Sequence, residues 1–445
     1  MNLFRCVMCI SIGRQILIGV AVAVAGALLR AADAPAPAPV GPWRFSFAAK
    51  AVPAGFTAVA PDTAYEAARG FGFEPDAVLA GADDAVASDR PFLFSAKIPE
   101  GNYRVVVTTP TGAAPLTIKS ESRRLMVEAG RGGRFEFAVN TRDARVPPPP
   151  LNAPGNDHVE LNNRENSPAN GLVLHWDDKL TLEFNGPRPA VRTLEIFPAP
   201  ELPTVFLAGD STVTDQPREP GASWGQMLPR WFRPTVAVAN HAESGETLKS
   251  FLTELRLDKI LSQMKRGDFL VLQFGHNDEK TNWPQTYVEA GTTYDAYLRV
   301  FIAEARRRGA TPVLVSPVQR RQFGPDGKIR NSHGDYPAAV ARVAREEHVG
   351  FIDLAAVSAR FYEALAPEKS PLAFSAGGRD VTHHNNYGAY ALAKAVAAGL
   401  HAACPELAAH LVADFPGFDP AQPDDPVAFA LAASPGRTNQ PPRGN

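Results

Sequence analysis

The chain has 445 residues, of which 45% are hydrophobic and 21% are charged. This length allows two domains, and the composition is that of an ordinary globular protein. The formal net charge of −2 provides no basic stripe of the kind that binds nucleic acid, so nucleic acid is not an expected partner.

The first segment, residues 1–33, has the pattern of a secretory signal peptide. Two arginines, Arg5 and Arg14, precede an apolar run over residues 16–29, and small residues follow it. A single membrane anchor is the alternative, but the run is shorter than the ~20 residues that a spanning helix needs. We therefore expect a secreted or periplasmic protein without a stable membrane anchor. Cleavage would leave Cys404 as the remaining cysteine, so no intramolecular disulfide is expected.

Residues 34–40 are rich in Ala and Pro and are predicted to be a linker, and residues 41–200 are predicted to be all β. Short apolar or alternating runs recur there between Gly, Pro, Asn and Asp turn signals, without a helical period. This pattern predicts an antiparallel β-sandwich of jelly-roll type. The runs are WRFSFAA, PFLFSAKI, YRVVVTT, LTIKS, RLMVEA, RFEFAVN, LVLHW, LTLEF and RTLEIF.

From residue 203 to residue 413, apolar strands alternate with amphipathic segments. The five expected strands are TVFLAGD, TVAVANHA, FLVLQFG, TPVLVSP and VGFIDLA, and helical spacing marks residues 248–255, 292–308 and 387–404. Strands that are apolar throughout must be buried on both faces, which predicts a parallel sheet in a three-layer α/β/α domain. Residues 414–445 are predicted to be a Pro-rich, peripheral or disordered tail.

Four polar stretches follow strands of this second region or precede its last helix. They are GDS (209–211), ESGET (243–247), GHND (275–278) and DVTH (380–383). In a doubly wound sheet, the carboxyl ends of the strands converge on one crevice. A serine, a histidine and an acid that meet there are the parts of a nucleophilic triad.

His383 is the preferred base of this triad. Of the ten histidines, it alone has an acid, Asp380, three residues before it. A short turn before the helix would let that carboxylate reach an imidazole nitrogen. The adjacent His384 would point elsewhere and is expected to be a packing or solvent-facing residue.

The four stretches, in this order, resemble the four sequence blocks of the SGNH (GDSL) hydrolases. GDSTVTDQ, FGHNDEK and DVTHHNNYGA are especially similar to the rhamnogalacturonan acetylesterases of carbohydrate esterase family 12, and the resemblance spans residues 203–405. It implies a flavodoxin-like α/β/α fold. It also implies Ser211 as the nucleophile, Asp380 and His383 as the rest of the triad, and Ser211, Gly245 and Asn277 as oxyanion donors.

Other roles remain open for several of these residues. Asn277 could be a turn residue and Gly245 a hinge before a helix, while Asp210 is expected to be a buried hydrogen-bonding brace. Glu246 stands where the resemblance leads us to expect arginine, which puts substrate recognition in question. The β region resembles the galactose-binding-like sandwich, and its role is either glycan binding or structural.

Two arginines after the fourth strand, Arg320 and Arg321, are candidate ligands for an acidic sugar such as galacturonate, because arginine pairs well with carboxylates. A solvated surface loop is the alternative. Trp224, Trp231 and Trp283 could line a glycan cleft or belong to the core.

The sequence thus predicts a serine esterase that removes acetyl groups from a pectic polysaccharide. Rival readings are an esterase for acetylated xylan or another ester, and a glycan-binding protein with an inactive esterase domain. The mechanism requires no cofactor, and no metal-binding motif is recognised in residues 34–445. Because the histidine base must be unprotonated, activity is expected to fall below about pH 6.

Overall fold

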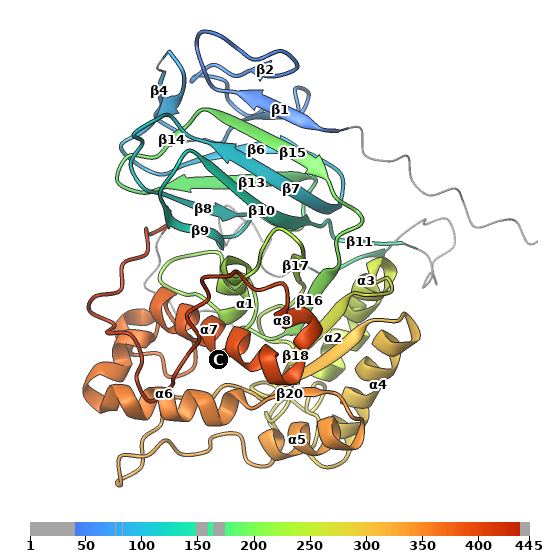
Figure 1. Cartoon of the computed structure of the whole chain (residues 1–445). Helices are drawn as coiled ribbons and strands as arrows, with labels where there is room; N and C mark the ends of the chain where they lie inside the picture. The colour runs from blue at the N-terminus through green and yellow to red at the C-terminus, as the bar shows by residue number, and fades with distance from the viewer. Residues whose placement is uncertain (1–40, 76, 82, 148–158, 163–173, 437–445) are drawn as a thin grey trace, which may run out of the picture. The chain divides into compact units, whose positions relative to one another are not determined.

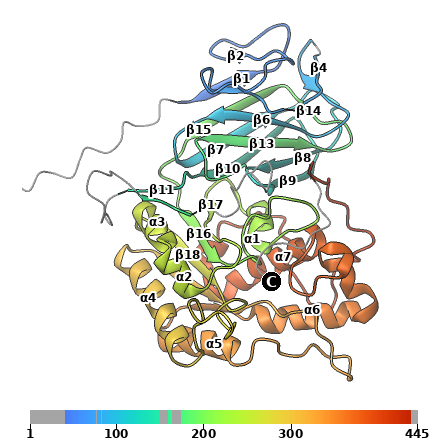
Figure 2. The same cartoon turned by 180° about the vertical axis from the view of Figure 1, so that it is seen from behind.

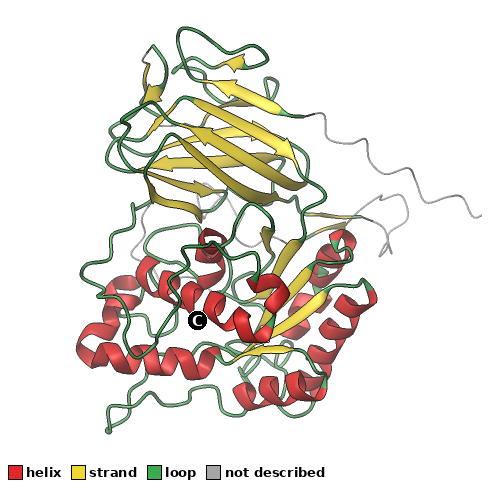
Figure 3. Ribbon diagram, in the orientation of Figure 1, coloured by secondary structure: helices red, strands yellow, loops and turns green. Residues whose placement is uncertain are grey.

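The computed structural model describes residues 41–75, 77–81, 83–147, 159–162 and 174–436. Strands dominate the described residues up to Pro198, whereas strands alternate with helices from Thr204 onward (Figure 3). The predicted signal peptide, the linker and residues 437–445 lie outside the described residues. Their roles stay predictions.

The N-terminal β region, residues 43–198, contains two five-stranded sheets. All neighbouring strands in them are antiparallel except β1 and β2. The first sheet has the order β10 (Arg134–Thr141), β7 (Gly101–Thr108), β15 (Thr193–Pro198), β1 (Trp43–Ser46) and β2 (Thr57–Ala58). The second has the order β3 (Phe71–Phe73), β6 (Phe92–Lys97), β13 (Lys179–Asn185), β8 (Leu116–Ser120) and β9 (Arg124–Gly130).

Smaller strand pairs flank these two sheets. One small sheet has the order β14 (Ala190–Val191), β5 (Val86–Ala87) and β4 (Ala80–Gly81), and β11 (Arg145–Val146) pairs with β12 (Val159–Glu160).

Both large sheets contribute to one hydrophobic core. Val105 and Val107 of the first sheet and Phe94 and Phe184 of the second are fully buried in the same cluster. Val105 and Val107 lie two residues apart in β7, as the alternation of side chains along a strand requires. The period-2 runs of the sequence therefore become the two inner faces of this region.

Eight of the nine expected runs form these strands, and LVLHW does not. Residues 172 and 173 are outside the described residues, and Trp176 makes only an isolated bridge with Asp143. The expectation of a strand is wrong for the described part of this run, because Trp176 has a φ of 61°, a left-handed conformation that extended strands do not adopt.

The second region contains a five-stranded parallel sheet with the order 2-1-3-4-5 of its strands. From edge to edge it comprises β17 (Ala237–Asn240), β16 (Thr204–Gly209), β18 (Phe269–Gln273), β19 (Thr311–Val315) and β20 (Gly350–Ile352). The predicted α/β class and parallel sheet are confirmed. The chain order reverses at β16, so a crevice is expected beyond the carboxyl ends of β16 and β18.

Helices cover both faces of this sheet (Figures 1 and 2). Along β16, Val205 and Leu207 pack with α1, α6 and α7, whereas Phe206 and Ala208 pack with α2, α3, α4 and α5. The helices are α1 (Trp224–Met227), α2 (Leu248–Thr253), α3 (Arg256–Gln263), α4 (Thr293–Arg307), α5 (Tyr336–Glu346), α6 (Leu354–Lys369), α7 (Asn386–Ala403) and α8 (Pro405–Ala408), with short 3₁₀ helices η2 (Leu228–Trp231), η3 (Ser370–Ala373) and η4 (Ala376–Gly378).

Local signals account for the ends of the helices. The Asn385 side chain caps α7 by accepting a hydrogen bond from the Gly388 N–H, and Gly309, with a φ of 76°, follows the end of α4. The helix expected over residues 248–255 is α2, which ends at Thr253, and Leu255, with a φ of 62°, separates α2 from α3.

Residues 414–436 contain no helix or strand among the described residues, yet they are held by specific contacts. The Lys119 ammonium donates to the Ala432 carbonyl at 2.7 Å, and the Tyr387 hydroxyl donates to the Asp424 carbonyl at 2.6 Å. This part of the predicted tail therefore packs against the rest of the chain.

Two further findings concern the cysteine and membrane predictions. Cys404 is a free, buried thiol. No helix in the described ranges is long and apolar enough to cross a membrane.

Candidate active site

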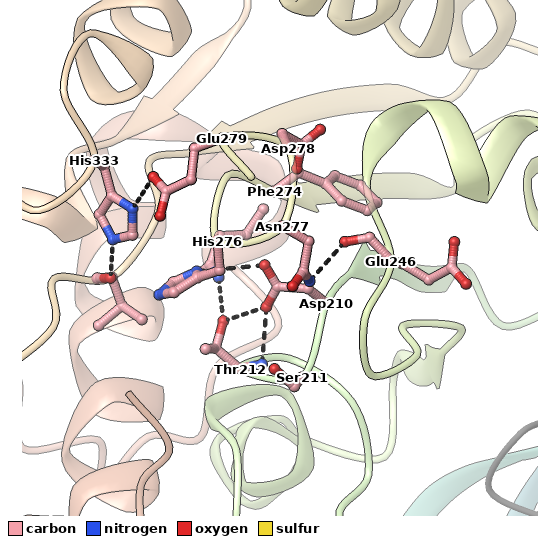
Figure 4. A network of polar contacts seen from close by, with 12 residues as sticks. Asp210, Ser211, Thr212, Glu246, Phe274, His276, Asn277, Asp278, Glu279 and His333 are labelled. Carbon is pink, nitrogen blue, oxygen red and sulfur yellow. Dashed lines mark hydrogen bonds and ion pairs between the residues drawn. The ribbon is translucent and has the colours of Figure 1, made fainter. Parts of the chain in front are cut away.

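The four polar stretches of the sequence meet beyond the carboxyl ends of the parallel strands. Ser211 follows β16, Gly245 follows β17 and Asn277 follows β18, while His383 precedes α7. Figure 4 shows Ser211 and Asn277 on neighbouring loops, with Asp210 between them. The sheet therefore supplies three segments of the site, and a loop before α7 supplies the fourth.

Ser211, His383 and Asp380 form one continuous hydrogen-bonded chain. The Ser211 Oγ lies 2.9 Å from His383 Nε2, and His383 Nδ1 lies 2.9 Å from Asp380 Oδ2. Because a carboxylate can only accept, we assign the hydrogen on Nδ1, which leaves Nε2 to accept the serine proton. All three side chains are buried, so this arrangement can act as nucleophile, base and orienting acid.

The Asp380 carboxylate is held ionised by the turn that it begins. Its Oδ1 accepts the backbone N–H groups of Thr382 and His383 at 2.8 and 2.9 Å, and Ser375 Oγ donates to Oδ2 at 3.2 Å. Burial by itself raises the pKa of Asp380, but the hydrogen bonds, above all from His383, lower the pKa by more. The net effect is a lowered pKa and a permanent negative charge beside the imidazole.

The candidate oxyanion donors come from three loops. Gly245 has a φ of 85°, a conformation that favours glycine. The Asn277 amide nitrogen donates to the Glu246 carbonyl at 3.0 Å, and Lys280 Nζ donates to Asn277 Oδ1 at 3.0 Å. These contacts fix which way the amide points. Since an amide nitrogen carries two hydrogens, one remains for a substrate oxygen.

Sequence reasoning missed the contact of Lys280 with Asn277. In the sequence, the contact shows only as a lysine three residues after the asparagine. In the structure, these residues form a turn in which the Lys280 N–H donates to the Asn277 carbonyl. That spacing is the one signal that could have pointed to it.

Asp210 has the bracing position that the sequence predicted. It is fully buried, and its Oδ1 accepts from the backbone N–H of Thr212 at 2.9 Å and from the Thr212 hydroxyl at 2.8 Å. Its Oδ2 lies 3.4 Å from His276 Nδ1 (Figure 4). Burial lowers the pKa of His276 to about 4, so its imidazole is neutral at pH 7.

His384 is a packing residue, as expected from its position next to His383. It is buried, and its Nε2 lies 2.7 Å from the Tyr362 hydroxyl. Burial lowers the pKa of His384 to about 3, so it carries no charge at pH 7.

The candidate substrate ligands Arg320 and Arg321 are both engaged within the protein. Arg320 Nη2 lies 2.6 Å from Glu279 Oε1, and Arg321 Nη2 donates to the Gly378 carbonyl at 2.6 Å, with its guanidinium over the Phe374 ring. Both residues are half-buried, unlike those of a fully solvated loop, and their role as ligands for an acidic sugar stays a prediction. Of the three candidate tryptophans, Trp224 and Trp231 are buried and belong to the core, whereas the Trp283 side chain is 58% exposed.

Glu246, the unexpected residue of the second block, points into the protein. Its side chain is fully buried, its Oε2 accepts the Ser250 hydroxyl at 2.6 Å, and its Oε1 lies 3.6 Å from Arg256 Nε. Arg256 also pairs with Glu243 at 2.5 Å. The carboxylate of Glu246 therefore interacts with Ser250 and Arg256 inside the protein and does not face a substrate.

Gly225 of α1 lies against the loop that follows Ser211, so we predict that Gly225→Ala disturbs this loop. A Cβ at position 225 would lie 2.2 Å from the Val213 carbonyl, which already accepts hydrogen bonds from Asn240 and Ser223. Overpacking of this kind costs about 1–3 kcal/mol. We expect a lower Tm and a lower kcat.

The matched control for this change is Gly133→Ala. A Cβ at position 133 would meet no atom within 4 Å. Equal Tm values for the two alanine variants in thermal unfolding would contradict the prediction.

No group of three or more His, Cys, Asp or Glu side chains in the described ranges is placed to hold a metal ion. The mechanism considered below uses only the side chains and backbone of the chain itself.

Comparison with known proteins gives one family match. A family model described as "GDSL-like Lipase/Acylhydrolase family" matches residues 207–391. This range begins in β16, just before Ser211, and ends within α7, after His383.

Three curated relatives from Bacillus subtilis (strain 168) are similar to the chain. Rhamnogalacturonan acetylesterase RhgT is 41% identical, over 47% of this chain and 94% of the relative. The probable rhamnogalacturonan acetylesterase YesY is 40% identical, over 44% and 91%. The uncharacterized esterase YxiM is 25% identical over 370 residues, which are 79% of this chain and 88% of the relative. This last alignment is longer than residues 203–445, so it includes part of the N-terminal β region.

Proposed function

Because the chain belongs to the GDSL-like lipase/acylhydrolase family and is a serine ester hydrolase, we propose that it removes acetyl groups from a polysaccharide with Ser211 as its nucleophile. The observation that carries this proposal is the hydrogen-bonded chain from Ser211 through His383 to Asp380. A vestigial domain in a glycan-binding protein would not be expected to keep this chain intact.

In the first half of the reaction, His383 Nε2 takes the proton of the Ser211 hydroxyl as Oγ attacks the acetyl carbonyl. The imidazolium that forms is stabilised by the ionised Asp380 at 2.9 Å. The imidazolium then gives its proton to the sugar oxygen as the bond between that oxygen and the acetyl carbon breaks, so the sugar leaves as a free hydroxyl and the acetyl group stays on Ser211.

In the second half, the same His383 nitrogen takes a proton from a water molecule as the water attacks the acetyl-serine, and the imidazolium then returns the proton to Ser211 Oγ as acetate leaves. Both halves pass through a tetrahedral intermediate with a negatively charged oxygen. The proposed donors to this oxygen are the backbone N–H groups of Ser211 and Gly245 and the side-chain amide of Asn277. Preorganised donors of this kind contribute about 10²- to 10³-fold each.

The proposed substrate is an acetylated pectic polymer, rhamnogalacturonan. Two relatives at 40% and 41% identity carry that activity in their names. A cavity of about 490 Å³ also lies beside the loop after Ser211, and it is lined by Arg90 and Arg218, whose guanidinium groups have no acceptor among the described residues. An acidic sugar would suit these two cations. Acetylated xylan or another ester is the alternative substrate.

The N-terminal β region would serve this reaction as an accessory, galactose-binding-like sandwich. Its two sheets share one core, in support of that architecture. Residues 1–33, as a signal peptide, would direct the enzyme to the periplasm or the exterior, where polysaccharides are met.

The test is acetate release by the purified protein from acetylated rhamnogalacturonan, with acetylated xylan in parallel. We expect release from the pectic polymer at the higher kcat/KM, and no release by Ser211→Ala. A preference for xylan would retain the mechanism and discard the proposed substrate. No release from either polymer or from small acetyl esters would contradict the proposed function.

A further inference from the structure

The loop over residues 211–222, which carries Ser211, is irregular but buried. Residues 211–216 are all buried, although no helix or strand lies between Gly209 and Trp224. Buried backbone carbonyls outside regular structure need hydrogen-bond donors from elsewhere. The question is which side chains supply them.

One set of donors comes from the N-terminal β region, at the turn between β8 and β9. Arg123 Nη1 donates to the carbonyls of Gln216 and Gly221 at 3.1 and 2.7 Å, and its Nη2 lies 2.8 Å from Glu219 Oε1. One side chain of the β region thus holds three residues of the loop.

A second set holds Asp215, which is buried in the same loop. Arg124 Nε lies 3.1 Å and Arg142 Nη2 lies 3.4 Å from Asp215 Oδ2, while Asn240 Nδ2 donates to Oδ1 at 2.8 Å. All three charged side chains are 1% exposed. Removal of Arg124 would leave a buried carboxylate with one weaker cationic partner, a costly state.

The turn that presents these arginines has an unusual backbone. Glu121 and Arg123 have φ values of 54° and 65°, in the left-handed region that favours glycine. Non-glycine residues persist there when the surrounding contacts over-determine them. The turn is therefore shaped to aim Arg123 and Arg124 at the loop after β16.

Arg123 is connected to Ser211 through one intermediate residue. Gln216, whose carbonyl accepts from Arg123, donates through Nε2 to the Ser211 carbonyl at 2.7 Å. Asn240, which holds Asp215, also donates to the Val213 carbonyl at 2.6 Å. The Ser211 carbonyl is thus bonded to Gln216, which Arg123 holds, and the Val213 carbonyl is bonded to Asn240 of β17, which shares Asp215 with Arg124.

We propose that Arg123 and Arg124 of the N-terminal β region are positioning residues for the nucleophile, so that the β region completes the active site of the α/β region. This inference rests on the proposed function, because it takes Ser211 as the nucleophile. It gives the β region a catalytic consequence that glycan binding alone does not require.

A matched control separates positioning from simple attachment of the two regions. Lys259 of α3 also joins them, with Nζ 2.7 Å from Glu100 Oε1 and 2.6 Å from the Arg145 carbonyl, and its side chain is fully buried. It makes no contact with the described residues 211–222. Loss of Lys259 removes a buried link of the same kind that does not contact the loop.

The experiment compares Arg124→Met, Arg124→Lys and Lys259→Met in the full chain. Three readouts are taken: kcat and KM for 4-nitrophenyl acetate, the rate at which a fluorophosphonate labels Ser211, and Tm. We expect kcat and the labelling rate of Arg124→Met to fall about 10²-fold with KM unchanged, because small misplacements of reacting groups have effects of that size. Arg124→Lys should recover part of the loss, and Lys259→Met should lower Tm only.

Equal kcat and labelling rates in Arg124→Met and Lys259→Met would overturn the inference. If the methionine variant does not fold, Arg124→Lys is compared with Lys259→Arg, and equal losses again overturn it. A wild-type protein that is labelled at Ser211 and hydrolyses the ester keeps the proposed function in either case. A wild-type protein that is not labelled at Ser211 overturns both proposals.

Discussion

Replacement of Ser211 by alanine is expected to lower kcat by about 10⁶-fold, because loss of the nucleophile removes the covalent route and leaves only the binding and oxyanion contributions. The Ser211 hydroxyl makes its hydrogen bond to His383 Nε2, while its carbonyl, which accepts from Gln216, is unaffected by the change. We therefore expect the fold and Tm of the variant to be close to those of the wild type.

Acetate release from acetylated rhamnogalacturonan and from 4-nitrophenyl acetate measures this loss. Labelling by a fluorophosphonate followed by peptide mass analysis should place the adduct on the peptide that contains Ser211, and should fail in the alanine variant. A variant that keeps more than a hundredth of wild-type kcat, with its Tm preserved, would assign the nucleophile to another residue.

Hydrophobic periodicity carried most of the fold prediction. The strands of the α/β region are apolar on both faces, as at Val205, Phe206 and Leu207, and only a sheet covered on two sides can bury such runs. The alternating runs of the β region predicted strands for the same reason. These signals are local, so they can be read without knowledge of the neighbours in space.

The predictions that were wrong or incomplete depend on contacts between distant segments. The end of α2 at Thr253, earlier than expected, goes with the left-handed conformation of Leu255 and with the packing of the following α3 against α4 and the sheet. The ion pair of Arg320 with Glu279, which follows another strand, at 2.6 Å was not foreseen either, and the role of Arg320 as a substrate ligand stays a prediction. The spacing of residues along the chain cannot predict an ion pair between segments that are distant in sequence.

The candidate site shows the same division. Ser211, Asp380 and His383 were predicted because their motifs are short and ordered, and the structure brings their side chains together. The pairing of Arg124 with Asp215 could not be predicted, since the two residues belong to different regions of the chain and neither has a local motif. Residues that hold a site in place are therefore harder to predict from a sequence than the residues that react.

Replacement of Asp380 by asparagine is expected to lower kcat by about 10⁴-fold, as happens when the acid of a serine triad is changed to its amide. Asp380 Oδ1 accepts two backbone N–H groups, so the oxygen of an asparagine would keep that place. Its amide nitrogen would then face His383 Nδ1 and donate to it. The imidazole hydrogen would be forced onto Nε2, which faces Ser211 and could no longer accept the serine proton.

The same variant isolates the pH dependence of stability that comes from Asp380. Because the pKa of Asp380 is lower in the folded protein, the ionised carboxylate stabilises the fold above the unfolded pKa of about 4, and this contribution is lost as the pH falls toward the folded value. An asparagine at position 380 does not ionise, so it makes no pH-dependent contribution to the stability of the fold. The difference in unfolding free energy between wild type and Asp380→Asn should thus shrink as the pH is lowered below about 4.

Urea unfolding between pH 7 and pH 3, together with kcat across the range where both proteins stay folded, measures both effects. A variant with more than a tenth of wild-type kcat would show that His383 does not depend on Asp380 for its tautomer. A stability difference independent of pH would show that Asp380 is not ionised in the folded protein.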